Sequence, residues 1–226
     1  MPEINAENTA ENTKSVIKKG DFIELDFSAY TKEGKLFDTT LESDAKKEEI
    51  DTRGKKFEPI VVCVGEGMLL RGLDKALEGK EIGKDYEISL KPENAFGKRN
   101  PQLIKTVPLS AFTEMPHAGM IVNVDGFIAR VASVTSGRAL VDFNNPLAGK
   151  EIIYKVKIRR IVKDNPSKIK TIAKMFGFEL ENLEEKEGHV KLFIKKSKSI
   201  RKEDLELLEK KIRELVKTEC EVLVKG

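Results

Sequence analysis

The stretch GEGMLLRGLDKALEGKEIGKDYEISLKPENAFG, residues 65–97, changes pattern from loop to helix to strand to loop. Its first half predicts a short amphipathic helix, because apolar side chains recur three or four residues apart until a glycine stops the pattern. The apolar positions are Leu69, Leu70, Leu73, Ala76 and Leu77. In the second half Tyr86, Ile88 and Leu90 alternate with polar residues, which predicts a strand with one face on a core. Pro92 should end that strand.

The flanking segments supply further strands for this helix to pack on. Residues 22–29 have an apolar alternation and lead into AYTKEGKLFDTT (residues 29–40), which predicts a hairpin turning at Glu33-Gly34. The apolar run FEPIVVCV (residues 57–64) predicts a buried strand, whereas the charged residues 41–56 predict a solvated loop with one helical turn at most. NNPLAGKEIIYKVKIRRI (residues 144–161) contains another alternating strand.

Four of these pieces, taken in order, resemble the FKBP-type peptidyl-prolyl cis/trans isomerases, specifically the long archaeal type with a domain inserted in the flap. They are the motif from Tyr30 to Thr40, the GEGMLLRGLDKALEG segment, the AFG after Pro92 and the NNPLAGK motif. The resemblance covers about residues 18–162. It implies an antiparallel half-barrel sheet around a short helix, and an enzyme that isomerises X-Pro bonds without a cofactor.

The expected architecture is therefore α+β with several domains. Residues 1–15 are polar and predict a disordered tail. Residues 16–98 and 143–162 would form the FKBP-type catalytic domain, and residues 99–142, with short apolar stretches separated by turn residues, would form an inserted β module. Residues 163–226 predict a C-terminal α-β-α-β domain.

The C-terminal segment has its own helical and strand periodicity. Asn165-Pro166 signals a helix start and Gly177 its end; a second helix, with Ser199 as a cap, has an apolar face. That face comprises Leu205, Leu208, Ile212 and Leu215. Because a two-stranded sheet is marginal alone, we predict a homodimer in which a second chain covers this face; the alternative is docking onto the catalytic domain of the same chain.

Composition excludes several classes of protein. Lys+Arg 41 against Asp+Glu 38 leaves a net charge of +3, which argues against a general nucleic-acid binder. No apolar run has the length of a membrane helix and the first residues lack an apolar signal segment, so we expect a soluble, cytoplasmic protein. Cys63 and Cys220 are expected to be buried, and His117 and His189 are too isolated for metal binding, so no metal is expected.

The resemblance also assigns a site. Tyr30, Asp38 and Phe96 would be the catalytic group, with Asp38 beside the amide carbonyl and the Leu70 N–H anchoring the substrate carbonyl after the proline. The substrate-binding residues would be Phe37, Val62, Leu69, Leu70, Leu73, Leu147 and Tyr154. Two positions depart from the family pattern: Phe96 replaces a common tyrosine, and Asn145 replaces a histidine found in many relatives with the insertion.

Three functions remain open at this point. In the first, an isomerase also holds unfolded chains on an apolar surface of the insert, formed by Phe112, Met115, Met120 and Ile121; the alternative is that these side chains fill the insert's own core. In the second, the chain binds proline peptides or unfolded chains without catalysis. The third is nucleic-acid or ribosome binding through Lys195, Lys196, Lys198, Arg201 and Lys202, a basic run that is usually solvated loop.

Overall fold

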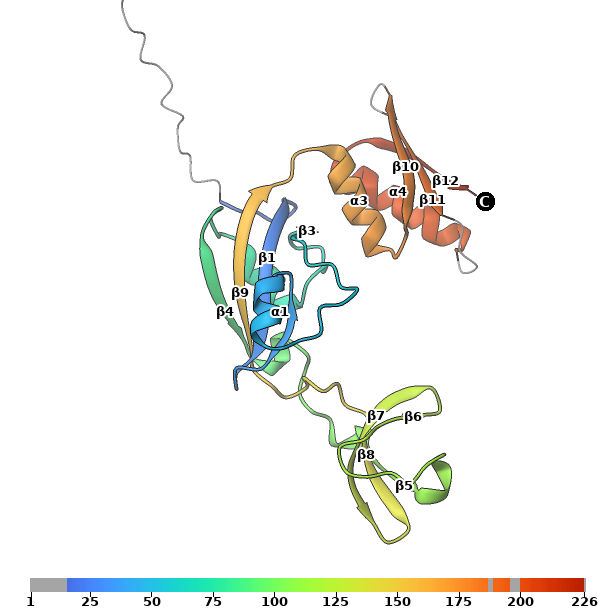
Figure 1. Ribbon diagram of the computed structural model, residues 1–226. Helices are drawn as coiled ribbons and strands as arrows, with labels where there is room; N and C mark the ends of the chain where they lie inside the picture. Colours follow the sequence, from blue (N-terminus) through green and yellow to red (C-terminus); the bar gives the residue numbers. More distant parts are fainter. Residues whose placement is uncertain (1–15, 187–188, 196–199, 226) are drawn as a thin grey trace, which may run out of the picture.

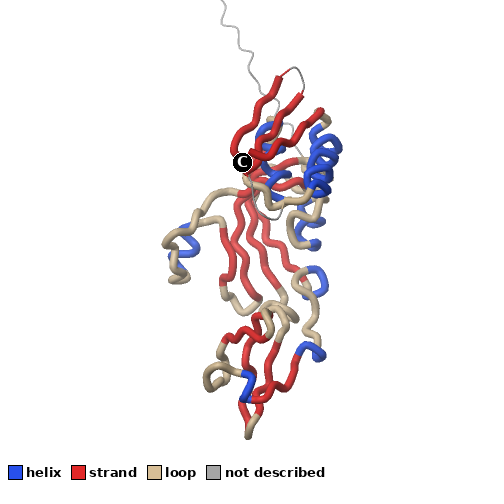
Figure 2. The backbone as a smooth tube through the Cα atoms, turned by 90° about the vertical axis from the view of Figure 1, so that its right-hand side faces the viewer, coloured by secondary structure: helices blue, strands red, loops and turns tan. Residues whose placement is uncertain are grey.

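The computed structural model describes residues 16–186, 189–195 and 200–225, and these form three sheets arranged along one molecule. The main sheet lies in the middle, with an inserted module at one end and a C-terminal module at the other (Figures 1 and 2). The mixed α+β class expected from the sequence is confirmed. The expected disordered tail, residues 1–15, lies outside the described residues.

The main sheet is antiparallel and centres on β1. Its strands are β1 (Phe22–Thr31), β2 (Leu36–Thr39), β3 (Ile60–Cys63), β4 (Asp85–Leu90) and β9 (Ile152–Ile161). Their order is β2-β1-β9-β4, and β3 pairs with β1 beside β2. The predicted hairpin turn is confirmed, since Gly34 N–H donates to the Thr31 carbonyl at 2.8 Å.

One face of the main sheet carries the core. Alternate residues of β1, namely Ile23, Leu25, Phe27 and Ala29, are buried there with Leu73 and Leu77 of α2 (Arg71–Leu77). This is the short amphipathic helix predicted from the sequence. A short 3₁₀ turn (Pro92–Asn94) follows β4 and leads to Phe96.

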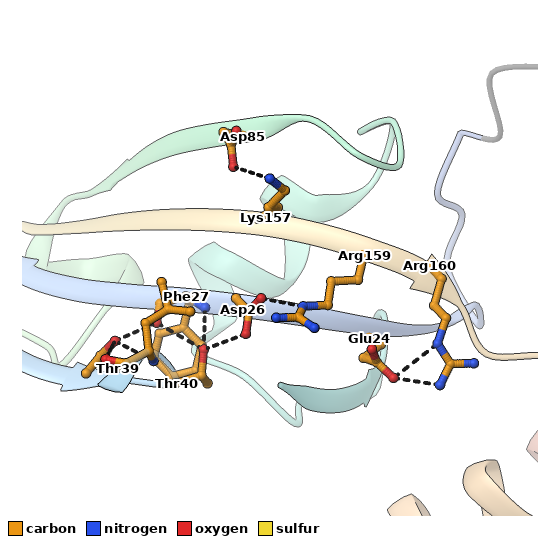
Figure 3. Close-up of polar contacts among 10 residues, drawn as sticks. Glu24, Asp26, Phe27, Thr39, Thr40, Asp85, Lys157, Arg159 and Arg160 are labelled. Atoms are coloured by element: carbon orange, nitrogen blue, oxygen red, sulfur yellow. Dashed lines mark hydrogen bonds and ion pairs between the residues drawn. The ribbon is translucent and has the colours of Figure 1, made fainter. Parts of the chain in front are cut away.

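The opposite face of β1 buries Phe22 at its start and is polar from Glu24 to Ser28, where ion pairs tie it to β9 (Figure 3). Arg159 on β9 pairs with Asp26, and Arg160 pairs with Glu24. Helix α1 (Glu42–Lys47) covers part of this face, because the Ser28 hydroxyl donates to the Asp44 carboxylate at 2.7 Å. Residues 41–56 were expected to be a solvated loop; they contain a six-residue helix that buries Ala45, and are therefore more ordered than predicted.

The inserted module has a sheet and a core of its own. Its strands, in the order β5-β8-β7-β6, are β5 (Ile104–Pro108), β6 (Ile121–Val124), β7 (Phe127–Thr135) and β8 (Arg138–Asp142). Two 3₁₀ turns, Pro101–Leu103 and Leu109–Ala111, flank β5. The buried core consists of Val122, Ala129, Val131, Ala139 and Val141.

The C-terminal module contains one more strand than expected. Its order is α3 (Asn165–Met175), β10 (Leu180–Lys186), β11 (His189–Lys195), α4 (Lys202–Val216) and β12 (Glu219–Lys225). The predicted α-β-α-β order is therefore corrected to α-β-β-α-β. The sequence pattern missed β10 because its stretch, LENLEEK, is mostly charged and has little apolar alternation. In the three-stranded sheet β11 lies between β10 and a parallel β12.

The helix face expected to meet a second chain is covered within this chain. Leu208 and Ile212 are fully buried against α3 and the sheet, and Leu205 and Leu215 pack on the same cluster. That cluster also contains Phe22, Cys63 and Val162 of the main domain. This helix face is therefore buried within the chain, as in the alternative arrangement, while the homodimer itself stays a prediction. Ser199 lies outside the described residues, and the N-cap position of α4 is Arg201.

Candidate functional site

A tight loop at residues 65–70 connects β3 to α2 and carries Leu69 and Leu70. The buried Asp74 carboxylate of α2 accepts hydrogen bonds from Gly65 N–H at 2.8 Å and from Gly67 N–H at 3.0 Å. Both glycines have positive φ, of 85° and 69°, a backbone conformation that L side chains rarely adopt. Asp74, a residue of helix α2, thus holds the backbone of the preceding loop in place.

Apolar side chains from seven segments, the loop itself among them, belong to one apolar cluster of the main domain. The buried ones are Val62, Leu73 and Tyr154, and those partly buried against them are Phe37, Leu69, Leu70, Phe96 and Leu147. The rings of Phe37 and Phe96 meet edge to face, with centroids 5.8 Å apart. We call this set of eight residues the apolar site; the sequence analysis assigned seven of them to substrate binding and Phe96 to the catalytic group.

A polar pair lies beside the apolar site on the same face of the sheet. The register places Asp38, Ala29, Tyr154 and Ile88 in one row across β2, β1, β9 and β4. Burial raises the pKa of the Asp38 carboxyl, although the Thr39 N–H opposes this shift. Burial also raises the pKa of Tyr154 to about 12, with the Asp38 charge adding to the shift. At neutral pH Tyr154 is therefore a protonated donor next to a carboxylate.

Tyr30 does not join this set, and its assignment to the site is corrected. It pairs with Leu36 and Ile153, so its side chain lies on the face opposite to Tyr154. There the Lys155 ammonium lies 5.2 Å from the centre of the Tyr30 ring. Burial and the nearby Asp44 charge raise the pKa of Tyr30, which places it with α1.

Phe27 occupies the place that Tyr30 was expected to take. Its ring centroid lies 5.7 Å from that of Tyr154, and the side chain is buried in the same cluster. Ile60, opposite Leu25 in the β1–β3 ladder, also packs against this cluster. The sequence held a signal for Phe27. Side chains of a strand alternate between its two faces, so Phe27 shares the buried face with Leu25 and Ala29, whereas Tyr30 points to the other face.

Two polar groups of the site have no partner among the described residues: the Leu70 backbone N–H and the Tyr154 hydroxyl form no hydrogen bond to any of them. Both are therefore available to a peptide. At the two departures from the family pattern, Phe96 contributes only its ring, and Asn145 accepts a hydrogen bond from Leu147 N–H at 2.8 Å. Asn145 thus shapes the turn that presents Leu147.

In the inserted module the four predicted surface residues separate into two groups. Phe112 and Met120 pack on the module's core, whereas Met115 and Ile121 are exposed. Phe127 and Ile128, which the sequence analysis did not select, are exposed by 68% and 75%. Ile121 and Ile128 share the outer face of the β6–β7 hairpin, since they pair with Arg130 and Asn123 respectively.

Residues 16–186, 189–195 and 200–225 contain no metal cluster, and their two cysteines are buried. No group of three or more His, Cys, Asp or Glu side chains in these ranges is placed to hold a metal ion. None of their helices combines the length and apolar content needed to cross a membrane. Cys63 and Cys220 are free and buried, as expected, and burial raises the pKa of each thiol to about 12. Lys196 and Lys198 of the basic run lie outside the described residues.

Comparison with known proteins identifies the chain's relatives. A model of the FKBP-type peptidyl-prolyl cis-trans isomerases matches residues 13–112, and a model of the FKBP26 IF domain matches residues 105–147. The chain is 34% identical over 150 residues to a short-type peptidyl-prolyl cis-trans isomerase of Methanocaldococcus jannaschii, an alignment that covers 65% of this chain and 95% of that protein.

Two bacterial proteins are similar over shorter shares of this chain. A probable FKBP-type 16 kDa isomerase of Pseudomonas fluorescens is 32% identical over 133 residues, covering 55% of this chain and 89% of that protein. The isomerase SlyD of Aeromonas hydrophila is 29% identical over 148 residues, covering 62% of this chain and 61% of that protein. From these matches and the arrangement of the main sheet around α2, the chain belongs to the FKBP-type peptidyl-prolyl cis-trans isomerases.

Proposed function

We propose that this isomerase binds proline-containing segments of folding polypeptides at the apolar site and that Asp38, Tyr154 and the Leu70 N–H orient the X-Pro amide there. The observation that carries the proposal is that these eight apolar residues share one cluster, and that two of them, Leu70 and Tyr154, carry a polar group without a hydrogen-bond partner among the described residues. Phe27 and Ile60 join the site's walls in place of Tyr30.

Amide rotation needs no nucleophile. The barrier of about 18–20 kcal/mol arises from amide resonance, which is lost when the bond twists. The twisted amide is less dipolar than the planar one, so an apolar surrounding disfavours the ground state relative to the transition state. Phe37, Phe96 and Tyr154 supply aromatic walls of that kind.

The polar groups hold the peptide while the bond turns. The Leu70 N–H donates to the carbonyl that follows the proline, and this contact fixes one side of the rotating bond. The Asp38 carboxylate lies beside the X-Pro carbonyl; the residue as a whole is exposed, but its carboxyl is desolvated enough for its pKa to rise, and this strengthens its electrostatic interactions. Orientation of this sort lowers the entropic part of the barrier.

The test is isomerisation of a proline tetrapeptide by the full chain and by Phe96→Ala and Asp38→Ala. Removing either side chain should lower kcat/KM by about tenfold, or ~1.4 kcal/mol of transition-state stabilisation. Tyr30→Phe is the matched control, since Tyr30 lies on the opposite face and should leave turnover near that of the wild type. A wild-type chain without turnover would favour the non-catalytic binding module instead.

The inserted module supports a second role, binding unfolded chains. Exposed Met115, Ile121, Phe127 and Ile128 present apolar area that a small soluble module otherwise buries, and methionine adapts to varied partners. We assign the holding of unfolded segments to these exposed side chains, of which Ile121 and Ile128 lie on the outer face of the β6–β7 hairpin and Phe127, opposite Val124, on the other face. Phe112 and Met120 pack on the module's core instead.

This role is tested by Ile128→Ser, with Met120→Ser as a comparison. Ile128→Ser should weaken suppression of aggregation of an unfolded client while leaving tetrapeptide isomerisation unchanged. Met120→Ser acts on the core of the module and should lower its melting temperature as well. Deleting residues 99–142 should remove the protection altogether; protection by the deleted form equal to that of the full chain would refute the role.

A further inference from the structure

Strand β3 is shared between the apolar site and the C-terminal module. Its side chains alternate, so that Ile60 and Val62 pack in the cluster of the main sheet, whereas Val61 and Cys63 belong to the cluster of the C-terminal module. The loop at residues 65–70 continues directly from this strand. Only one strand therefore separates the site from the C-terminal module at this position.

An ion pair joins the same loop to helix α4. The Lys211 ammonium lies 2.5 Å from the Glu66 carboxylate, and the two side chains are only 22% and 15% exposed. Glu66 stands between Gly65 and Gly67, whose N–H groups Asp74 holds from the other side. A pair with so little exposure is screened weakly by salt, and breaking it by removing one partner leaves a poorly solvated charge.

Met68 adds an apolar contact at the same place. Its side chain packs against both clusters, and its sulfur accepts a hydrogen bond from Cys63 N–H at 3.2 Å. The next two residues in the chain are Leu69 and Leu70 of the apolar site. The loop is thus held on one side by Asp74 and on the other by Lys211 and the packing around Met68.

Lys211 is the positive charge among the acidic residues around Cys63. Glu66 and Asp74 both act to raise the pKa of the Cys63 thiol, after burial itself, and Lys211 opposes them. Lys211 also lies 3.3 Å from the Glu214 carboxylate, but that side chain is 55% exposed, so Glu66 is the less hydrated of its two partners. Without Lys211 the poorly exposed Glu66 carboxylate would lose this ion pair, and the loop would move to return it to water.

We propose that the C-terminal module positions the substrate-contacting loop of the isomerase site, with Lys211 as a positioning residue that acts through Glu66. The inference rests on the proposed function of the apolar site. It adds a role for residues that neither matched family model reaches, since those models end at residue 147.

The test compares full-length Lys211→Met, Glu66→Gln and the double variant with wild type. Lys211→Met should lower kcat/KM on a proline tetrapeptide by about tenfold, because sub-ångström displacement of an orienting group is costly. It should also shift the amide NMR resonances of Leu69 and Leu70. The double variant, which removes both charges of the Lys211–Glu66 pair, should lose less than the two single variants added together. Lys191→Met breaks an exposed ion pair of the same module and is the control.

The outcomes separate the two claims. Unchanged Leu69 and Leu70 resonances with wild-type kcat/KM in Lys211→Met would overturn the positioning role. A wild-type chain that fails to isomerise the tetrapeptide would refute the proposed function, while the amide resonances would still decide whether Lys211 positions the loop. If Lys211→Met does not fold, the resonances of the double variant decide in its place, and melting curves separate a local shift from global unfolding.

Discussion

The two modules attached to the main domain are joined to it in different ways. The C-terminal module shares one apolar cluster with it, in which Phe22, Cys63 and Val162 pack against Ile169 and Ile172 of α3. The inserted module has a separate core of five buried residues. Its two connections meet at a polar neck, where Asn100 N–H donates to the Asn144 side chain at 2.8 Å and Gly149 N–H donates to the Gly97 carbonyl at 2.8 Å.

This difference should decide which module is coupled to the main domain and which is independent of it. A shared core transmits strain and stability, because close-packed interiors resist change in any one part. Hydrogen bonds at a solvated neck contribute roughly 1 kcal/mol each and fix direction more than stability. We therefore expect the C-terminal module to act on the main domain, and the inserted module to act beside it.

Truncation after Val162 should have the largest effect. It exposes Phe22, Cys63 and Val162, each at most 2% exposed in the intact chain. At ~1.5–3 kcal/mol for each large side chain, the loss is about 5 kcal/mol, comparable with the whole stability of many domains. Thermal melts of the fragment should fall by tens of degrees, to the point of aggregation.

Deleting residues 99–142 is the matched control for that truncation, because it removes a core that the main domain does not share. Its melting temperature should stay close to that of the full chain. If the fragment truncated after Val162 melted within a few degrees of the full chain, the comparison between the modules would fail.

A pair of core substitutions measures the same contrast without removing any segment. Ile169→Ala in α3 should cost about 2–5 kcal/mol, and Val131→Ala in β7 somewhat less, since each leaves a cavity in a dry core. Hydrogen exchange shows how far each effect spreads. Ile169→Ala should accelerate exchange in β1 and β3, whereas Val131→Ala should accelerate it only in β5 to β8; equal spread from both would break the contrast.

The parts of the fold with strong periodicity could be predicted from the sequence. Helix α2 follows from apolar residues three or four positions apart that end at a glycine, and strand β4 from alternating apolar residues that end at a proline. The turn at Asp125-Gly126 follows from residues that accept positive φ, here 52° and 85°. Strand β10 could not be found in this way, because its charged sequence forms a strand only when paired with β11. Tertiary pairing outweighed local pattern there.

Most residues of the site could be predicted from the sequence, but one of them was predicted wrongly. The motifs led to eight residues that the structure brings together, yet motif spacing does not show which face of a strand a residue occupies, and Tyr30 was placed on the wrong one. The contact between Glu66 and Lys211 was out of reach for a different reason. The two residues are far apart in sequence, and only the docking of the C-terminal module brings them to 2.5 Å.

Asp38→Asn should have a smaller effect that is confined to the main domain. We expect tetrapeptide turnover to fall about tenfold, equivalent to ~1.4 kcal/mol, because a neutral amide orients the X-Pro carbonyl less strongly. If the inserted module is independent, the loss should be the same when Ile128→Ser is also present. A loss that depended on Ile128 would show that the two regions communicate.

The pH dependence of this variant provides a second measurement. Burial raises the pKa of Asp38 above its ordinary value of 3.8 in the folded protein, so the folded state holds the proton more tightly than the unfolded state does. Stability then falls as the pH rises from 3.8 through the folded-state pKa. Asp38→Asn removes this penalty, and should therefore melt higher than wild type at neutral pH and show no advantage below pH 3.8.

The smallest expected effect is at the junction between the main domain and the C-terminal module. Asp164 is the N-cap of α3, and its side chain accepts a hydrogen bond from Ser167 N–H at 2.9 Å. Asp164→Ala should cost about 1 kcal/mol, a typical value for loss of a cap, measured by denaturant unfolding. If the shared apolar core holds the module in place, this loss should leave the Leu69 and Leu70 amide resonances unchanged.

Acid titration distinguishes the cap from the core. The hydrogen bonds from Ser167 hold the pKa of Asp164 below its ordinary value of 3.8, so the folded state binds its proton less tightly than the unfolded state does. The stabilisation is complete above pH 3.8 and is lost as the pH falls through the folded-state pKa. The difference in unfolding free energy between wild type and Asp164→Ala should therefore shrink in that acidic interval. The destabilisation by Ile169→Ala involves no titrating group, so it should persist there. A cap effect that stayed constant through the interval would mean that Asp164 stabilises α3 through packing and not through its charge.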